Sequence, residues 1–374
     1  MADTDGRWSD DLPADLLRLI LRRLPCQLDR ATFRAVCCAW RHLPPPLLCF
    51  NNECFQNLTD DDEPPRPRFD LPARHYSCCD DWLLYINDDE VVLTLSTATF
   101  TMFHPLSGTT IAGIPLFADG YEGLTGFPTP KALFEPKVIV CLLDLVATLL
   151  CGGEVAFCRP GDRSWSVSLS RDAGGQRCDS ITDITLYCGK IFAVDSNDHI
   201  FVHELMLIGG EPKTSRAAAK HVIMALLHQP PATSSEEEQW LRWLVVCRTK
   251  LLMVRWSVVP EAEIKIKTEE IKLKVFEAGF ETRQWLEVND LGDHALFIGS
   301  GCSKAIRMTS GDDQRFQGNR VYFLGLDFGH KYSHWVDCRD RPTYGYYDLK
   351  NGIFLPRTSN VWPQHSMQWF FPCE

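Results

Sequence analysis

Histidine pairs and glycine motifs are the sequence features of this chain that could support catalysis or cofactor binding. His199 and His203 stand four residues apart on a predicted strand. That spacing puts both side chains on one face but about 13 Å apart, at roughly 3.3 Å per residue, which is too far for one metal ion. His203-Glu204 lacks the second histidine of an H-E-x-x-H zinc motif, and Gly299-Ser300-Gly301 lacks the third glycine and the following helix of a dinucleotide fingerprint. The chain also has no G-x-S-x-G elbow and no P-loop, so the sequence predicts no catalytic residues and no cofactor.

The chain has 16 cysteines, and their spacing argues against a metal site. No C-x-x-C pair occurs, and the adjacent pairs Cys37-Cys38 and Cys78-Cys79 cannot easily converge on one tetrahedral zinc. Residues 1–11 are acidic and lack the basic start and apolar core of a signal peptide, so disulfides are not expected. We therefore predict isolated, buried, reduced thiols in a protein of the cytoplasm or nucleus.

Charge and composition narrow the classes of function. The 38 Lys and Arg residues against 49 Asp and Glu residues give a net charge of −11, which is the wrong sign for a general nucleic-acid binder. Hydrophobic residues make up 45% of the chain and charged residues 23%, as in ordinary globular proteins. The longest apolar run, residues 138–151, contains Asp144 and is shorter than the ~20 residues of a membrane span. It predicts a buried pair of strands, and we expect the protein to bind neither nucleic acid nor a membrane.

An amphipathic helical pattern occupies the N-terminal part of the chain. Leu12-Pro13 precedes Asp15 as at the start of a helix, apolar residues then recur every three or four positions, and Pro25 ends the pattern. The apolar stripe consists of Leu16, Leu17, Ile20, Leu21 and Leu24. A second helical pattern includes Phe33, Val36, Cys37 and Trp40 and stops at the prolines of residues 44–46.

This helical module is too small to bury a good core alone, since domains below roughly 40 residues usually need metals, disulfides or a partner. Its leucines are therefore expected to face another protein. Six arginines against Asp15 and Asp29 give residues 12–44 a charge of +4, and −11 − 4 leaves −15 on the rest of the chain. The alternative is a helical hairpin that packs on the rest of the same chain, with its arginines in solvent.

The remainder of the chain begins with a connecting segment and continues as short strands. Residues 47–74 lack an apolar period and include the acidic, proline-rich run 60–67, so we interpret them as a linker. Past residue 75, β-branched or aromatic runs bounded by Gly, Asn, Asp or Pro predict strands. These runs are residues 82–86, 91–95, 138–143, 190–194, 199–203, 244–247 and 251–256. The clearest element is a hairpin over residues 189–203 that turns at Ser196-Asn197-Asp198. Lysines alternating with apolar residues over 264–274 are interpreted as the solvent face of another hairpin.

Regularly spaced strands and turns indicate a sandwich, a barrel or a propeller. Trp165 and Trp285 open predicted strands 120 residues apart, and Trp82 lies 83 residues before Trp165. These separations are near multiples of about 40 residues, and a four-stranded propeller blade has about 40 to 50. The spacing modestly favours a propeller over a pair of sandwiches.

The N-terminal residues resemble an F-box. The resemblance is carried by residues 8–17 (WSDDLPADLL), 20–24 (ILRRL), 33–37 (FRAVC) and 39–41 (AWR). F-boxes are three-helix hooks that bind the Skp-type linker protein of cullin-RING ubiquitin ligases. By this resemblance, the partner-facing and core positions of the hook are Leu12, Pro13, Leu16, Ile20, Leu24, Val36 and Trp40, and the spacing does not separate the two groups.

Residues 80–372 resemble a plant family in which an F-box precedes a propeller of undefined function, related to the KIB-type propellers. The matching motifs occur in the family's order. They are residues 103–108 (FHPLSG), 114–116, 156–162 with Trp165, 189–195, 291–299, 318–323, 347–349 and 369–372. The sequence departs from the family at His104, where Asn is usual, and at residues 258–270, which look like an inserted loop.

These features predict an α+β multidomain chain with a three-helix F-box over 8–46, a linker over 47–74 and an all-β propeller of six or seven blades over 75–374. The resemblance implies a non-catalytic, substrate-recruiting adapter of an SCF-type ubiquitin ligase. The F-box would bind a Skp-type linker protein and through it a cullin, and the propeller would bind an unknown target. The alternative is a propeller enzyme or carbohydrate-binding module with its site on loops at one mouth of the channel.

Overall fold

The structure is a computed structural model, and it describes the chain in a series of ranges. They are residues 48–51, 54–57, 66–67, 76–79, 82–86, 99–103, 109–115, 137–142, 145–149, 154–162, 165–168, 181–206, 218–222, 239–258, 273–299, 301–308, 316–324, 344–357 and 367–371. Within these ranges the regular elements are all strands. None of the described residues forms a helix with the length and apolarity needed to cross a membrane. The predicted F-box over 8–46 lies outside the described ranges, and so does the predicted strand over 91–95.

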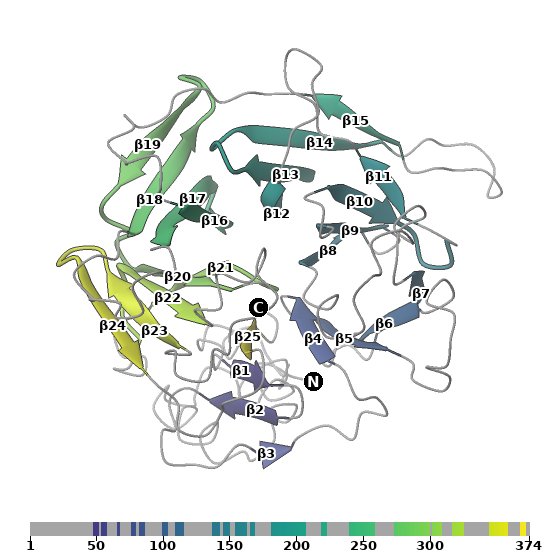
Figure 1. Cartoon of the computed structure of the whole chain (residues 1–374), viewed down its shortest axis with the longest axis horizontal. Coiled ribbons are helices and arrows are strands. Elements are labelled where there is room, and N and C mark those ends of the chain that lie inside the picture. Colours follow the sequence, from purple (N-terminus) through teal and green to yellow (C-terminus); the bar gives the residue numbers. More distant parts are fainter. Residues whose placement is uncertain are drawn as a thin grey trace, which may run out of the picture.

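The described strands form six sheets that stand around a ring, as in a β-propeller (Figure 1). Blade 1 contains β25 (Met367–Phe370), β1 (Leu48–Asn51), β2 (Cys54–Asn57) and β3 (Arg66–Pro67). Blade 2 contains β4 (Tyr76–Cys79), β5 (Trp82–Ile86), β6 (Thr99–Phe103) and β7 (Thr110–Pro115). Blade 3 contains β8 (Val138–Leu142), β9 (Leu145–Leu149), β10 (Val155–Cys158) and β11 (Ser166–Ser168).

The second half of the ring continues in sequence order. Blade 4 contains β12 (Ile181–Tyr187), β13 (Lys190–Asp195), β14 (Ile200–Met206) and β15 (Ala218–Val222). Blade 5 contains β16 (Gln239–Cys247), β17 (Lys250–Val258), β18 (Leu273–Gly279) and β19 (Gln284–Val288). Blade 6 contains β20 (His294–Ile298), β21 (Lys304–Arg307), β22 (Arg320–Leu324), β23 (Tyr344–Asp348) and β24 (Ile353–Arg357). Blade 6 differs from the others because β20 and β22 pair in parallel, with β21 on the far side of β20.

Strands from both ends of the described chain close the ring in blade 1. The C-terminal β25 lies toward the middle of the ring and pairs with β1 in an antiparallel ladder that sets Leu48 opposite Phe370 (Figure 1). The segment interpreted as a linker, 47–74, therefore supplies β1, β2 and β3 to the propeller, and the boundary set at residue 75 is too late. The strands were missed because they have at most four residues and β3 contains Pro67, which is tolerated only at a sheet edge.

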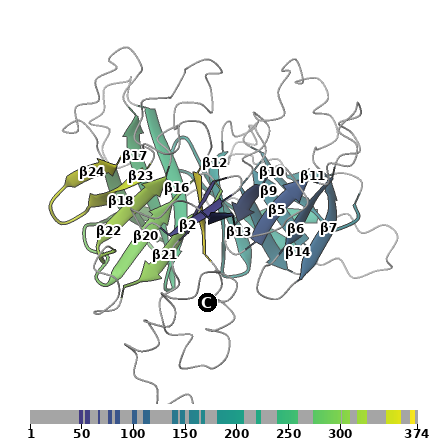
Figure 2. The ribbon, with the colours of Figure 1, turned by 90° about the horizontal axis from the view of Figure 1, so that it is seen from below.

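The hydrophobic core consists of buried layers between neighbouring blades. Along β13, Ile191 and Ala193 join a cluster with blade 3, whereas the alternate residues Phe192 and Val194 join a cluster with blade 5. Because both faces of such a sheet are covered, its strands read as continuous apolar runs. Similar clusters lie between blades 2 and 3, 5 and 6, and 6 and 1. These clusters link the blades in order from blade 2 through blade 6 to blade 1. Figure 2 shows the blades of the ring from below.

The predicted strand pair over 138–151 is confirmed by β8 and β9, and the predicted hairpin over 189–203 is confirmed by β13 and β14. The predicted tryptophan repeat agrees with the structure for Trp165 and Trp285 but not for Trp82. Trp285 lies on β19 and Trp165 directly precedes β11, and both strands are the outer edges of their blades. Trp82 instead opens β5, the second strand of its blade, so the period of about 40 residues was wrong: loops stretch two blades over the 120 residues from Trp165 to Trp285.

Candidate interaction surface

The residues predicted to bind a Skp-type linker protein all lie outside the described ranges. They are Leu12, Pro13, Leu16, Ile20, Leu24, Val36 and Trp40. Their roles stay predictions. A candidate surface can be built only on the propeller, whose turns gather at the two ends of the ring.

The two histidines singled out from the sequence have separate structural surroundings. His203 is fully buried and its ring lies 5.9 Å from that of Phe157 in blade 3. His199 is partly exposed, and its Nδ1 lies 2.9 Å from the Asp195 carboxylate. Among the described residues, no three His, Cys, Asp or Glu side chains are grouped closely enough to hold a metal ion.

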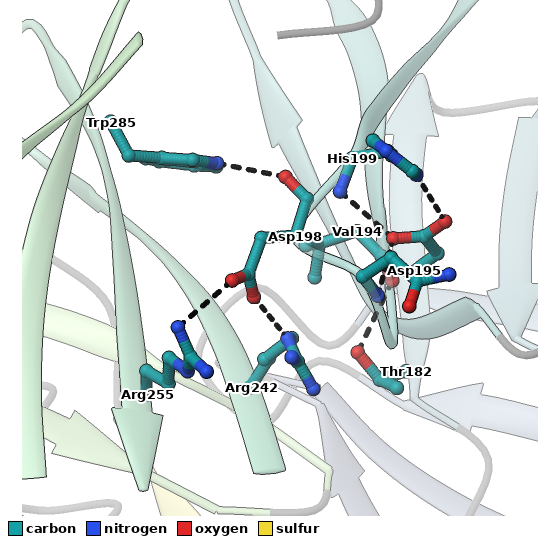
Figure 3. A network of polar contacts seen from close by, with 9 residues as sticks. Thr182, Val194, Asp195, Asp198, His199, Arg242, Arg255 and Trp285 are labelled. Carbon is teal, nitrogen blue, oxygen red and sulfur yellow. Dashed lines mark hydrogen bonds and ion pairs between the residues drawn. The ribbon is translucent and has the colours of Figure 1, made fainter. Parts of the chain in front are cut away.

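The turn between β13 and β14 is held by a buried carboxylate. Asp195 Oδ1 accepts hydrogen bonds from the backbone N–H groups of Asn197 and His199, each at 2.8 Å. Its other oxygen faces His199, and Thr182 donates to the neighbouring carbonyl of Val194 at 3.2 Å (Figure 3). An Asp side chain that satisfies its own turn in this way is a common turn device. The turn is therefore rigid, while Ser196 and Asn197 stay exposed at its tip.

Asp198, the next turn residue, joins blade 4 to blade 5. It has a left-handed backbone with φ of 66°, which Asp tolerates better than most residues, and this directs its side chain inward. Arg242 of β16 donates to one carboxylate oxygen, and Arg255 of β17 donates to the other at 3.1 Å. Trp285 of β19 donates its indole N–H to the Asp198 carbonyl at 2.8 Å (Figure 3). One residue thus contacts three strands of the next blade.

A second buried carboxylate connects the inner strands of blades 3, 4 and 5. The Lys137 ammonium, just before β8, lies 2.8 Å from Asp183 Oδ2 on β12. The same oxygen accepts the backbone N–H of Leu244 on β16 at 2.7 Å. Buried charges are stable only when they are paired and hydrogen-bonded, so this pair fixes how the three inner strands are placed.

The opposite end of β13 leads to a more exposed group of charges. Asp293 accepts hydrogen bonds from Arg248 on the β16–β17 turn and from Arg307 on β21, both at 2.6 Å. His294 also lies within 2.7 Å of this carboxylate. The hydrogen bond from Arg307, more than any other contact, lowers the pKa of Asp293 to about 2. The two guanidinium groups remain largely exposed, so they can meet a partner without breaking the core.

Aromatic residues adjoin this group of charges. Tyr187 stacks on Phe280 at 5.9 Å, and its hydroxyl donates to the carbonyl of Thr249 at 2.7 Å. Desolvation by its neighbours raises the pKa of Tyr187. The turn after Tyr187 consists of Cys188 and Gly189, both with positive φ, as a two-residue hairpin requires. Blades 4 and 5 are thereby joined at both ends.

The described cysteines agree with the predicted isolated thiols at four of five positions. Cys141, Cys158, Cys247 and Cys302 are buried thiols outside any disulfide, and Cys188 is an exposed one. Burial raises the pKa of Cys141 to about 12 and raises those of Cys158 and Cys247 in the same direction. A thiol with a raised pKa is a poor nucleophile, so these buried side chains act as core residues.

Sequence reasoning missed the residues that hold the surface together. Asp198 was noted only as a turn former, yet its partners Arg242 and Arg255 lie 44 and 57 positions away. A pairing over that separation leaves no local signal in a single sequence. The arrangement as a whole presents rigid turns and exposed guanidinium groups at the ends of the ring, which suits binding of a macromolecule.

Comparisons with known proteins agree with this architecture. The model of the KIB1-4 beta-propeller family matches residues 56–349. F-box protein At2g17036 of Arabidopsis thaliana is 25% identical over 77% of this chain and 76% of its own length. F-box protein SKIP23 of Arabidopsis thaliana is 23% identical over 86% of both chains. A putative F-box protein of the same plant, At5g55150, is 27% identical over 46% of this chain and 42% of its own.

Proposed function

Because the chain belongs to the KIB1-4 beta-propeller family and resembles F-box proteins over most of its length, we propose that it is a substrate-recruiting adapter of an SCF-type ubiquitin ligase. In this role the N-terminal hook, residues 8–46, binds a Skp-type linker protein and through it a cullin. The propeller binds the target protein. The adapter works in the cytoplasm or nucleus and performs no chemistry of its own.

The observation that supports this proposal most strongly is the order of the two parts. An F-box-like pattern over residues 8–41 stands directly before a propeller whose first strand begins at Leu48. The family model matches residues 56–349, within the propeller, and the relatives that match over most of this chain are F-box proteins by name.

The proposed mechanism is proximity. A target held by the propeller meets the ubiquitin-carrying enzyme at a raised effective concentration, as in any tethered reaction. The rigid ends of the ring suit this task, since a flexible binding surface would lose more entropy on ordering. At one end, Ser196 and Asn197 project from a fixed turn; at the other, Arg248 and Arg307 project around Asp293.

The linker-binding half can be tested by charge substitution in the hook. In the variant Leu16→Asp with Ile20→Asp, two carboxylates would have to enter an apolar interface, which costs several kcal/mol for unpaired charges. We expect co-purification with the Skp-type linker protein to be lost. The matched control is Leu286→Asp, which places the same charge on an exposed leucine of β19 and should leave co-purification unchanged. Wild-type recovery of the linker protein with the double variant would refute the F-box assignment.

A further inference from the structure

Two carboxylates of the ring each bond two arginines, but the two groups differ in exposure. The arginines that share Asp198 are buried between blades 4 and 5, with side chains 5% and 15% exposed. Arg248 and Arg307, which share Asp293, have side chains 60% and 70% exposed. The Asp198 group is therefore enclosed, whereas the Asp293 group faces solvent.

The two exposed arginines bond Asp293 with only part of their guanidinium groups. Arg307 donates through Nε to Oδ2, and Arg248 donates through the terminal nitrogen Nη2 to Oδ1, both at 2.6 Å. A guanidinium group has five N–H donors, so this carboxylate uses a minority of the donors that the two groups offer. Two guanidinium groups on one carboxylate give a local charge of +1 when His294 is neutral. A second anion that reached both groups would balance this charge.

The turn that carries Asp293 is held in place by the rest of blade 6. The backbone N–H of Leu291 donates to Asn319 Oδ1 at 2.9 Å, and the carbonyl of Asp293 accepts the N–H of Met308, next to Arg307, at 2.6 Å. The carboxylate that positions both guanidinium groups is therefore itself fixed. Groups that are positioned in advance lose less conformational entropy when a ligand binds.

The end of the ring that carries Asp293 is more basic than the chain as a whole. Contacts across blades 4, 5 and 6 place the β12–β13, β16–β17, β18–β19 and β23–β24 turns at this end. The basic residues of these turns and of the strand ends beside them are Lys190, Arg248, Lys250, Arg283, Arg307, Arg320 and Lys350. The acidic ones are Glu277, Glu281, Asp290, Asp293 and Asp348. Seven basic and five acidic residues give these described turns a charge of +2, against −11 for the whole chain.

An aromatic pair adjoins the arginines. Tyr187 and Phe280 stack on each other, and the Tyr187 hydroxyl bonds the carbonyl of Thr249, the residue after Arg248. Both rings are partly exposed. Tyrosine and arginine are among the residues that contribute most to protein-binding hot spots. The combination favours a segment of a protein over a small anion as the ligand.

We propose that Arg248 and Arg307 bind an acidic segment of a partner protein, whose carboxylates accept the N–H donors that Asp293 does not use. The planar guanidinium group can bind a carboxylate through two parallel hydrogen bonds, which a lysine cannot do. Nucleic acid fits this site less well, because its phosphates would meet the net negative charge of the chain. The inference rests on the proposed function only for the identity of the partner as the target of the ligase.

The test is fluorescence anisotropy of a short, dye-labelled peptide of alternating Glu and Gly, titrated with the full chain at low ionic strength. We expect this peptide to bind and the matched peptide of Gln and Gly not to bind, since the ligand groups are carboxylates. In the variant Arg248→Gln with Arg307→Gln, the dissociation constant should rise at least tenfold. Binding of the double variant as tight as that of the wild type would overturn the proposal. Tighter binding of single-stranded DNA of the same charge would overturn it in favour of nucleic acid.

A charge-matched control separates the site from the overall charge of the chain. Arg307→Gln and Lys274→Gln each remove one exposed positive charge, but Lys274 lies near the other end of β18. We expect the dissociation constant to rise at least threefold for Arg307→Gln and less than twofold for Lys274→Gln. An equal rise for the two variants would contradict a local site.

A milder variant keeps the test valid if the glutamines disturb the turns. Arg248→Lys with Arg307→Lys keeps both charges but loses the paired donors of the guanidinium groups, so binding should weaken severalfold at an unchanged melting temperature. Wild-type affinity of the lysine variant would overturn the role of the guanidinium groups.

Co-purification with the Skp-type linker protein, measured on the same samples, separates this inference from the proposed function. Variants of Arg248 and Arg307 should retain the linker protein, because these residues lie outside the hook. A chain that binds the acidic peptide but no linker protein would refute the ligase role alone. A chain that binds the linker protein but not the acidic peptide would refute the acidic-segment site alone.

Discussion

The interface between blades 4 and 5 and the closure between blades 6 and 1 join neighbouring blades by different means. Between blades 4 and 5, Asp198 is buried with two arginines, and Trp285 bonds its carbonyl. At the closure, Trp369 and Phe371 pack on Phe297, and one hydrogen bond joins Trp369 Nε1 to the Ile298 carbonyl at 2.8 Å. Both interfaces contain a buried apolar cluster; the first adds a matched set of buried charges, and the second depends on aromatic area.

The difference follows from what each interface must specify. Blades 4 and 5 are consecutive along the chain, so they are already close together when they pack. Buried charges can then select one relative placement of the two blades. Blades 6 and 1 are joined by strands from opposite ends of the described chain, and large aromatic side chains supply favourable contact over many geometries. Loss of one member of a buried charge set leaves the other charges unpaired and lowers the unfolding free energy sharply. Truncation of an aromatic side chain lowers it in proportion to the buried area that is removed.

Removing one charge between blades 4 and 5 should have the largest effect. Asp198→Asn keeps a residue that tolerates positive φ but removes the carboxylate that Arg242 and Arg255 share. Breaking a buried ion pair in this way costs about 3–5 kcal/mol of unfolding free energy. Denaturant unfolding of the full chain measures the loss.

A variant that removes all three charges sharpens the comparison. Adding Arg242→Met and Arg255→Met to Asp198→Asn removes the charges without a large change in volume, and most of the lost stability should return, because apolar replacements of buried ion pairs are often neutral. If the single variant loses less than 1 kcal/mol, the charges do not hold the blades together.

Stepwise truncation of Trp369 should lower the unfolding free energy in proportion to the part of the side chain that is removed. Trp369→Phe loses the bond to the Ile298 carbonyl and part of the ring, and we expect about 1–2 kcal/mol of destabilisation. Trp369→Ala removes the whole ring and should cost about 3–4 kcal/mol. The same denaturant unfolding measures both variants. A larger loss for phenylalanine than for alanine would contradict a closure based on packing.

The exposed carboxylate at Asp293 extends the comparison to pH. The pKa of Asp293 is about 2, below the ordinary value of 3.8. The ionised carboxylate therefore contributes to the unfolding free energy above pH 4, and this contribution is lost as the pH falls toward 2. Arg307→Gln removes the main cause and should move the pKa of Asp293 upward toward 3.8. A carbon-13 NMR titration of the aspartate carboxyls measures this change. An unmoved titration would show that Arg248 and His294 suffice to hold the carboxylate ionised.

The smallest effect is expected for an exposed ion pair. Lys274 and Glu287 lie 3.3 Å apart with both side chains more than 40% exposed. Lys274→Ala should change the unfolding free energy by less than about 0.5 kcal/mol, because solvent screens such pairs. If Lys274→Ala lowered the unfolding free energy as much as Asp198→Asn does, burial could not be the reason why the two ion pairs differ in strength.

The sequence predicted the propeller because its strands are short, apolar and bounded by turn residues, as in the hairpin of β13 and β14. It missed β1, β2 and β3 because strands of two to four residues beside an acidic, proline-rich run carry no readable period. It also missed the set of Asp198, Arg242 and Arg255, since the fold alone brings these residues together. The seven hook positions came from resemblance to a family, and they remain to be tested by the linker-binding variants.

The measurement that tests the proposed adapter most directly is a reconstituted ubiquitination assay, with a target captured on the propeller from proteasome-inhibited cells. It compares the full chain with a chain that starts at Leu48, the first residue of β1. We expect the truncated chain to bind the target, to support no ubiquitination, and to inhibit the full chain when added in excess, because it separates the target from the ligase. Ubiquitination of the target at the full rate by the truncated chain would contradict the proximity mechanism.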